Sequence, residues 1–429
     1  MTTELTRFTQ WVSEQPQQRY TALMGMLADE RGLAESVHRQ KANKAKGVDG
    51  IGKADYEKNL DANLADLSAR LRRMGHRPKP ARRVYIPKAN GGQRPLGIPS
   101  FEDRIVQDRL SRILQAIWEP EFRECSYGFR PNKSAHQALS RLNHIIVKER
   151  TQWLVEADIK GFFDHVHHQH LMRFIEHRIG DSNLLRVIQR FLKAGILEDG
   201  VFCESREGTP QGGLVSPVLA NIYLHYVLDL WFEKRFAQGC QGKAHLVRYA
   251  DDFVGCFEYE ADARGFEQAL KTRLAQFALE VEPTKTALIR FGDLAPALCQ
   301  REGDRRPRTF NFLGFTHYIA LKRGRAKLGR KTQRERVHKK LKALGAQLRA
   351  LRTEGTRAMQ EHVRRHLAGH IQYYGVSGNS RRLRAYVFQV VRRLYTWLNR
   401  RSGRRSFNWP QYQAWLQRWL PRPRIVHAL

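Results

Sequence analysis

The sequence predicts an α+β fold whose strands carry a few acidic residues and whose C-terminal quarter is a basic helical bundle. Three observations lead to this prediction. Runs rich in apolar and β-branched residues flank tight-turn sequences at 83–98 and 245–257. A further β-run, 153–158, ends on an aspartate. Beyond residue 330, apolar residues recur at helical spacing among lysines and arginines.

Composition narrows the class of protein before any motif is considered. The chain has 429 residues with 41% hydrophobic residues, enough for several domains with real cores. It carries 75 Lys and Arg against 42 Asp and Glu, a net charge of +33. Such an excess indicates a polyanionic partner. A basic membrane-surface protein is the rival interpretation, but no apolar run reaches transmembrane length. We therefore expect no membrane association.

The ends and the cysteines indicate a cytoplasmic protein. The N-terminus has no basic segment followed by an apolar stretch, so we expect no signal peptide and a bacterial-type cytosol, associated with the nucleoid. Five scattered cysteines include no C-x-x-C pair, which argues against a zinc module. Residues 1–40 form an N-terminal extension, with an amphipathic helix expected around Tyr20–His38.

The segment 83–98 predicts a β-hairpin, because the turn sequence "ANGG" separates two β-runs. Downstream, "WLVEADIKGFFDHV" (Trp153–Val166) reads as a strand that ends at Asp158. "HLVRYADDFVGCF" (His245–Phe257) reads as strand, tight turn and strand, with Asp251 and Asp252 at the turn. Adjacent aspartates also occur in ordinary hairpin turns, so this pair alone does not define a site.

The acidic stretches together predict a metal centre. Neighbouring carboxylates repel each other, and burying them requires a cation. Oxygen ligands shared with substrate phosphates suit Mg²⁺, and two such ions can activate a 3′-hydroxyl and stabilise a leaving pyrophosphate. Between the acidic stretches, "REGTPQGG" supplies a loop whose backbone can approach a ligand closely, and Ser216-Pro217 opens an apolar helix.

The C-terminal quarter predicts three amphipathic helices. Residues 321–429 contain 28 Lys and Arg but only three acids. Apolar stripes run through 337–351, 359–371 and 383–398, and "GNS" at 378–380 supplies a turn before the third helix. Faces this poor in acids favour nucleic-acid contact over a merely solvated surface. The dense aromatics at 409–419 either stack on unpaired bases or pack the core of a compact cap.

Six motifs then occur in the order found in reverse transcriptases. They are "YIPKANGGQRPLGIPSFEDRIVQ" (85–107), "SYGFRP" (126–131), "ADIKGFFD" (157–164), "GTPQGG" (208–213), "YADD" (249–252) and "FNFLGF" (310–315). In addition, "KGVDG" (46–50) is similar to an N-terminal block that intron enzymes have and retroviral ones lack. The chain most resembles the group II intron-encoded kind, the maturases. This resemblance implies a right-hand polymerase with an antiparallel palm sheet. Fingers and palm would span 41–320, the helical thumb (domain X) 321–402, and a basic DNA-binding-like region 403–429.

The resemblance also implies roles for individual residues. Asp158, Asp251 and Asp252 would be catalytic, and they would bind two Mg²⁺ ions together with the backbone of Ile159. The side chains that would contact the dNTP are Lys88, Arg94, Phe163, Gln211 and Lys285, with the Phe163 ring excluding a 2′-hydroxyl. Gly314 would lie in the primer grip, and the RNA- and DNA-binding arginines would be Arg364, Arg365, Arg392 and Arg393.

The implied function is RNA-directed DNA synthesis on an RNA template from a DNA primer. Binding to a parent group II intron RNA would assist splicing and mobility into a DNA target. No RNase H-like acidic cluster or His-Asn-His pattern is present in the sequence, so the resemblance is to the shorter, endonuclease-less class. The alternatives are a predominantly RNA-binding splicing maturase, a domesticated relative in DNA repair or phage defence, and a viral-type RNA polymerase, against which Phe163 argues.

Overall fold

A computed structural model describes residues 3–15, 18–87, 92–209, 212–304, 306–322, 325–400 and 407–429. The chain forms two compact units, each assembled from segments that are separate in sequence. The first unit contains Met1–Ala138, Ala157–Gly255 and Tyr259–Leu288. The second contains Leu139–Glu156, Cys256–Glu258 and Ile289–Leu429.

Helices near the N-terminus of the first unit surround one long buried helix. The surrounding helices are α1 (Thr3–Glu14), α2 (Met24–Leu27), α3 (Glu30–Arg39), α4 (Lys53–Glu57) and α5 (Leu60–Arg72), and the central one is α6 (Phe101–Trp118). The single helix expected over Tyr20–His38 is wrong. The Asp29 side chain accepts a hydrogen bond from Gly32 N and so starts α3 separately from α2.

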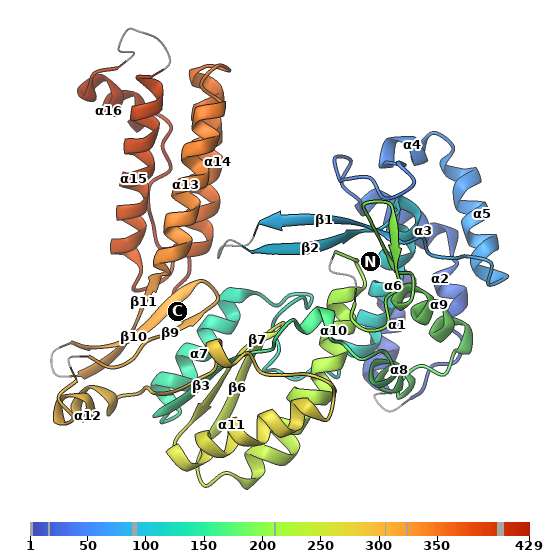
Figure 1. The fold of residues 1–429 in the computed structure, drawn as a ribbon, viewed down its shortest axis with the longest axis horizontal. Helices are drawn as coiled ribbons and strands as arrows, with labels where there is room; N and C mark the ends of the chain where they lie inside the picture. The colour runs from blue at the N-terminus through green and yellow to red at the C-terminus, as the bar shows by residue number, and fades with distance from the viewer. Residues whose placement is uncertain are drawn as a thin grey trace. The chain divides into compact units, whose positions relative to one another are not determined.

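The predicted hairpin is confirmed in the first unit. Strands β1 (Ala81–Pro87) and β2 (Gln93–Ile98) pair antiparallel, with Ile86 opposite Arg94. Two short strands, β4 (Ile196–Glu198) and β5 (Val201–Cys203), extend this sheet in the order β2-β1-β4-β5. The hairpin projects from the N-terminal helices (Figure 1). Its turn, which includes Lys88, lies outside the described residues.

A second four-stranded sheet carries the acidic motifs. Its order is β6-β7-β3-β8, formed by Ala244–Tyr249, Asp252–Phe257, Trp153–Asp158 and Ala287–Arg290. Only two residues join β6 to β7, and a connection this short requires an antiparallel pair. The predicted strand that ends at Asp158 is therefore confirmed, as is the predicted strand-turn-strand around "YADD".

Further helices precede, separate and follow the strands of this sheet in the sequence. They are α7 (Ala135–Lys148), α8 (His168–Glu176), α9 (Ser182–Leu192), α10 (Ser216–Leu224), α11 (Glu260–Ala275) and α12 (Ala295–Arg301). Helix α10 has a proline in its first turn, as the sequence predicted. A π-helical segment, His225–Asp229, continues directly from α10. Its last residue, Asp229, is fully buried, which matters for the site described below.

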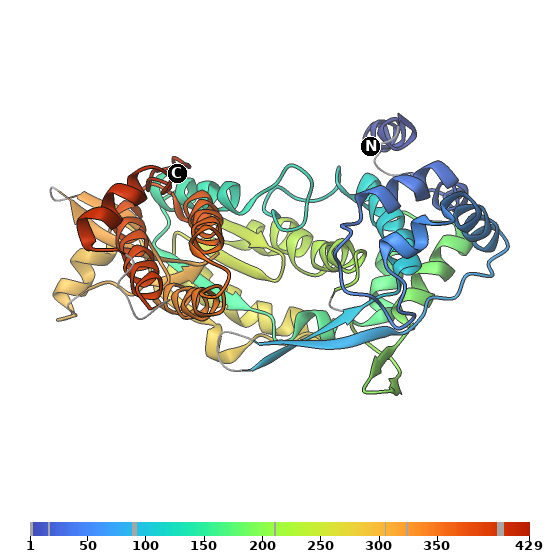
Figure 2. The same cartoon turned by 90° about the horizontal axis from the view of Figure 1, so that it is seen from above.

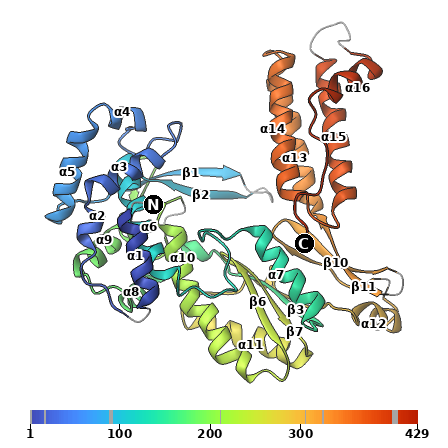
Figure 3. The same ribbon diagram turned by 180° about the vertical axis from the view of Figure 1, so that it is seen from behind.

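The second unit contains the predicted helical bundle. Helices α13 (Arg334–Ala350), α14 (Thr356–Tyr374) and α15 (Ser380–Leu398) stand side by side in Figures 1 and 3 and are seen end-on in Figure 2. Their buried residues follow the predicted stripes, including Leu344, Val363 and Leu394. A three-stranded sheet of order β11-β10-β9 precedes them, with β9 at Phe310–Phe312, β10 at Phe315–Lys322 and β11 at Arg325–Thr332.

A short helix and an extended tail close the second unit. In α16 (Trp409–Gln417), Tyr412 is fully buried and its hydroxyl donates to Val391 O at 2.8 Å. The tail returns to the α14–α15 turn, where Val376 and His427 form a parallel bridge. Of the two alternatives for the terminal aromatics, the compact cap is therefore confirmed for Tyr412.

Candidate active site

The "YADD" turn is a two-residue connection with a strained first residue. Ala250 has φ +58°, a left-handed conformation that is uncommon for a residue with a side chain. Asp251 follows it in the turn, and Asp252 is the first residue of β7. Both aspartates are half-buried. A backbone held in this conformation needs support from the surrounding structure.

Arg248 supplies that support from inside the first unit. It is fully buried and makes a two-pronged ion pair with Asp229, at 2.7 Å from Nε to Oδ1 and 2.5 Å from Nη2 to Oδ2. Nη1 donates to Ala250 O at 2.9 Å and to Asn221 Oδ1 at 3.1 Å. The guanidinium thereby fixes the carbonyl that directly precedes Asp251. Sequence reasoning missed this pair, although Arg248 stands in the motif itself.

The "SYGFRP" segment braces the same turn from the other side. Arg248 N donates to Cys125 O at 2.7 Å, and Tyr127 N donates to Arg248 O at 2.9 Å. Gly128 lies so close to the turn that a Cβ there would stand 2.3 Å from Ala250 N. Only glycine fits this contact without moving the turn. This motif therefore packs against the "YADD" hairpin.

Asp158 reaches the site from the end of β3. Glu282 N donates to Asp158 O at 2.8 Å, and Ile159 forms an antiparallel bridge with Val281. This pairing leads into the 3₁₀ turn Pro283–Lys285, whose last residue bonds to the Asp158 carboxylate through Nζ. Lys285 thus lies beside Asp158, although it stands 127 residues further along the chain.

Electrostatics couple the two candidate acids. Burial raises the pKa of Asp251, and the negative charge of Asp158 raises it further. The charges of Arg94 and Lys285 act in the opposite direction and lower the Asp251 pKa. The bond to Asp158 raises the pKa of Lys285, which keeps its ammonium charged. Asp158, Asp251, Arg94 and Lys285 therefore share one electrostatic environment.

The fit of this site to a divalent cation depends on two carboxylates. Among the described residues, no set of three or more His, Cys, Asp and Glu side chains is arranged to hold a metal ion. Asp158 and Asp251 remain, and because burial and the charge of Asp158 disfavour the ionised form of Asp251, an added cation would stabilise that form. Mg²⁺ commonly takes one or two carboxylates and completes its ligands with substrate phosphates and water. The residues present fit that mode of binding.

The loops around Asp158 are fastened to each other. Phe163 lies in the 3₁₀ turn Phe162–Asp164, and Thr209 N donates to its carbonyl at 2.7 Å. His168 Nε2 and Gly208 O lie 2.7 Å apart, which also ties this loop to α8. "GTPQGG" therefore packs against "ADIKGFFD". Gln211 itself lies outside the described residues.

The remaining predicted residues lie in the second unit. Gly314, with φ +81°, and Leu313, with φ +48°, form the two-residue turn between β9 and β10. Tyr373 Oη donates to Leu313 O at 2.9 Å, and a Cβ on Gly314 would lie 3.0 Å from Tyr374 Oη. Helix α14 therefore braces the turn in which the predicted primer-grip glycine lies.

The four predicted RNA-binding arginines fall into two kinds. Arg364 and Arg365 both pair with Glu361, at 2.9 Å and 3.5 Å. Arg392 lies 5.9 Å from the centre of the Phe388 ring, and Arg393 donates weakly to Gln389 O at 3.4 Å. The first two arginines therefore have a carboxylate counter-charge nearby, whereas no ion pair is found for the other two within the described chain.

Comparison with known proteins identifies relatives of the chain. Residues 86–317 match the family model described as "Reverse transcriptase (RNA-dependent DNA polymerase)". Protein YkfC of Escherichia coli (strain K12) is 36% identical over 276 residues, 57% of this chain and 72% of that protein. The group II intron-encoded protein LtrA of Lactococcus lactis subsp. cremoris is 46% identical over 158 residues, 36% of this chain and only 26% of LtrA.

Among solved structures, telomerase from Candida albicans in complex with a fragment of telomeric RNA aligns with a TM-score of 0.46 and 10% identity. The alignment covers 85% of this chain and 65% of that one. No helix in the described ranges is both long enough and apolar enough to cross a bilayer.

Proposed function

The chain belongs to the reverse transcriptase family and is related to group II intron-encoded proteins, and from this premise we propose that Asp158 and Asp251 form its catalytic centre. One observation carries the proposal. Two acids that are 93 positions apart in sequence are coupled electrostatically at the ends of adjacent strand segments, with Lys285 bonded to one of them. Asp252 would be the less direct second acid of the hairpin pair.

Asp158 and Asp251, with the backbone of Ile159, would hold the two Mg²⁺ ions. When bound, these ions supply Lewis-acid activation of the primer 3′-hydroxyl and neutralise charge on the departing pyrophosphate. The primer oxygen forms a bond to the α-phosphorus of the dNTP, and the bond to pyrophosphate breaks. The chain's own part is to hold the two carboxylates in place. The Arg248 bond to Ala250 O would position Asp251, and the charges of Arg94 and Lys285 lower the pKa of Asp251 against the effect of burial.

The other predicted residues would bind the nucleotide. Arg94, whose charge acts on Asp251, and Lys88 would contact the triphosphate from the hairpin. Lys285 would assist the departing pyrophosphate, since its raised pKa keeps the ammonium protonated. The ring of Phe163 would exclude a 2′-hydroxyl, and Gln211 would lie against the incoming nucleotide. We expect Phe163→Ala to increase incorporation of rNTPs relative to dNTPs.

Primer extension on an RNA template tests the catalytic proposal. Asp251→Asn should reduce Mg²⁺-dependent DNA synthesis by at least about a thousandfold, because removal of a metal-ligating charge forfeits most of the transition-state stabilisation. Asp199→Asn makes the same chemical change at an exposed turn of the first unit and should leave synthesis unchanged. Full activity of Asp251→Asn would refute the assignment.

The second unit favours a further role in binding the parent intron RNA and the DNA target. Its three-helix bundle lies within a segment of 28 Lys and Arg against three acids, a density that suits phosphate contacts over a large folded RNA. Gly314 would take part in the primer grip of the same unit. The contacts of Arg364, Arg365, Arg392 and Arg393 would then serve splicing and mobility as well as synthesis.

This maturase role separates from synthesis by mutation. Asp251→Asn should leave assistance to splicing of a group II intron intact, since RNA binding does not use the acids. Charge reversal at Arg392 and Arg393 should weaken both activities. If Asp251→Asn, while folded, abolishes splicing assistance as well, the two functions are not separable as proposed.

A further inference from the structure

A basic pocket lies in the first unit, apart from the acidic motifs. It is an open depression of about 390 Å³ between helix α9 and the stretch that precedes β1. Four cationic side chains line it, together with two prolines: Arg77, Arg186, Arg190, Lys193, Pro78 and Pro80. Neither the sequence motifs nor the catalytic proposal assigns a role to this cluster.

The four cations lack an acidic partner. No carboxylate lies within 4.0 Å of any of them in the described chain, and the side chains of Arg186 and Lys193 make no hydrogen bond there. Other arginines of the same unit are paired; Arg70, for example, holds Glu102 through two bonds of 2.9 Å. Burial lowers the pKa of Arg190, and repulsion from Arg77 and Arg186 lowers it further. An anion in the pocket would relieve this repulsion.

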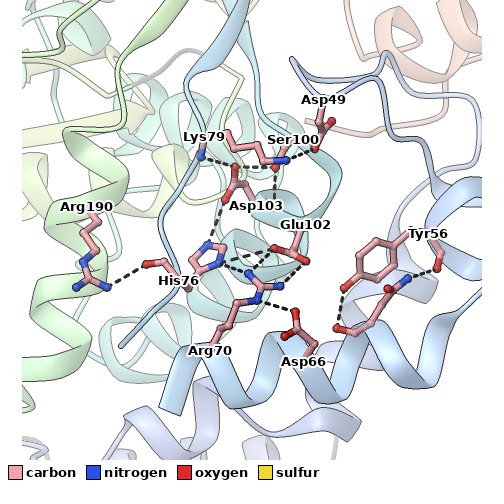
Figure 4. A network of polar contacts seen from close by, with 11 residues as sticks. Asp49, Tyr56, Asp66, Arg70, His76, Lys79, Ser100, Glu102, Asp103 and Arg190 are labelled. Carbon is pink, nitrogen blue, oxygen red and sulfur yellow. Dashed lines mark hydrogen bonds and ion pairs between the residues drawn. The ribbon is translucent and has the colours of Figure 1, made fainter. Parts of the chain in front are cut away.

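Arg190 is held in place before any ligand binds. Its Nη1 donates to Met74 O at 2.8 Å and to His76 O at 3.0 Å. The hydrophobic face of α9, which includes Val187 and Phe191, is buried, so the helix presents its basic face in a fixed position. Figure 4 shows Arg190 reaching the His76 carbonyl from α9.

The segment that carries Arg77 is fixed on both sides. His76 is 3% exposed, and its Nε2 lies 3.2 Å from Asp103 Oδ1 (Figure 4). Asp103 in turn accepts hydrogen bonds from Lys79 N at 3.0 Å and Ser100 Oγ at 2.6 Å. Pro78 and Pro80 restrict the backbone between these anchors. The wall of the pocket is therefore preorganised, which lowers the entropic cost of binding.

The chemistry of the lining selects a phosphate group. Guanidinium groups match the geometry of phosphate oxygens, and a lysine adds a point charge. The pocket is also separate from the nucleotide site. Ile86, the partner of Arg94, stands five residues after Ala81 along β1, which corresponds to about 17 Å of extended strand. A dNTP bound at Arg94 would not fill the pocket.

We propose that this pocket binds a backbone phosphate of the nucleic acid on which the enzyme acts. The inference rests on the proposed function, because that function supplies the polyanion. The pocket would fix the path of the strand over the first unit, and it would contribute to template affinity without touching the reacting groups.

The test is a salt series of equilibrium RNA binding. The double variant Arg186→Gln/Lys193→Gln removes two charges that make no hydrogen bond in the described chain, so folding should be retained. One lost phosphate contact should reduce the slope of log affinity against log salt by about 0.7 and weaken binding about fivefold near 0.1 M salt. In primer extension, the KM for template should rise while kcat is unchanged.

The matched control is Arg264→Gln/Lys271→Gln on α11, which removes the same charge from exposed residues that pair with Glu260 and Glu267. It should leave the slope unchanged. Equal slopes for the pocket variant and wild type would overturn the proposal. The proposal would also be overturned if the pocket binds only free anions. In that case inorganic phosphate would stabilise wild type but not the variant, and the affinity for RNA would be unchanged.

The outcome is independent of the catalytic assignment. Binding is measured without synthesis, so the slope change is expected in an Asp251→Asn background as well. If Asp251→Asn retains synthesis but the pocket variant still loses RNA affinity, the catalytic proposal fails and the pocket stands. If Asp251→Asn loses synthesis but the pocket variant keeps its RNA affinity, the catalytic proposal stands and the pocket proposal fails.

Discussion

The "YADD" hairpin and the C-terminal bundle use arginine in opposite ways. Arg248 is fully buried, bonded to Asp229, Asn221, Ser126 and the carbonyl of Ala250. Arg364, Arg365 and Arg392 are exposed and Arg393 is half-buried. The contacts found for these four arginines are with Glu361, Phe388 and Gln389 on their own helices. One substitution in the buried network should cause a large loss of stability and activity. Substitutions of exposed charges should each cause a small, additive change in RNA affinity. The difference separates residues that position the acids from residues that attract the substrate.

Breaking the buried pair should give the largest effect. Arg248→Met leaves the Asp229 carboxylate buried without its partner, and the free energy of unfolding should fall by about 3–5 kcal/mol. DNA synthesis should fall as well, because the bond to Ala250 O is lost. Urea unfolding and primer extension measure the two effects.

A double variant separates stability from positioning. Arg248→Met/Asp229→Leu removes both charges, so most of the lost stability should return. Activity should stay low, since nothing replaces the bond to Ala250 O. Recovery of full activity together with stability would show that the network is only structural.

Gly128 tests the packing of the turn without changing any charge. A Cβ at this position would stand 2.3 Å from Ala250 N and 2.9 Å from Tyr249 C, so Gly128→Ala should displace the turn. Because misplacement by about 1 Å can cost up to about a hundredfold in rate, we expect a loss of kcat of that order. Gly25→Ala, with no atom within 4 Å of the added Cβ, is the matched control and should be fully active.

The sequence predicted those features of the hairpin and of the bundle that depend on local patterns. Strand ends, the hairpins at 83–98 and 245–257, and the three helical stripes depend on periodicity and turn residues, and all were found. Asp158 and Asp251 were predicted from a strand end and a hairpin turn and given catalytic roles by the family resemblance, which alone singled out Lys285. Their coupling became visible only in the fold, because strand pairing brings Lys285 to Asp158 across 127 residues.

Tertiary contacts account for what the sequence did not predict. Neither residue spacing nor hydropathy identifies Asp229 as the partner of Arg248, because an acidic residue at the end of an apolar helix is expected on the surface. The apolar periodicity continues through the break between α2 and α3 and so did not predict it, although Asp29 caps α3. The basic pocket joins residues 77 and 186–193, and only the folded unit brings them together.

A smaller effect should appear in the pH dependence of stability. Burial and Asp158 raise the pKa of Asp251, so folding favours the protonated acid and the ionised form destabilises the protein at neutral pH. Asp251→Asn should therefore melt higher than wild type at pH 7 without divalent metal. This gain should shrink as pH falls through the raised folded pKa, and vanish below about 3.9, the usual pKa of an unfolded aspartate.

Added Mg²⁺ sharpens the same measurement, because it should stabilise wild type and not Asp251→Asn. Asp199→Asn, at an exposed turn, should melt like wild type at every pH. A wild-type protein that is more stable than Asp251→Asn at pH 7 in the absence of metal would contradict the electrostatic account of the site.

The smallest effect should separate the two kinds of exposed arginine. Arg392→Gln/Arg393→Gln removes charges without a carboxylate partner in the described chain, whereas Arg364→Gln/Arg365→Gln removes charges already shared with Glu361. The first pair should lower the salt slope of RNA binding by up to about 1.4 and the second pair by less, while melting temperatures barely change. Equal slopes for both pairs would show that Glu361 does not offset the charges of Arg364 and Arg365. Pairing with a carboxylate would then have no effect on how strongly these arginines contribute to RNA binding.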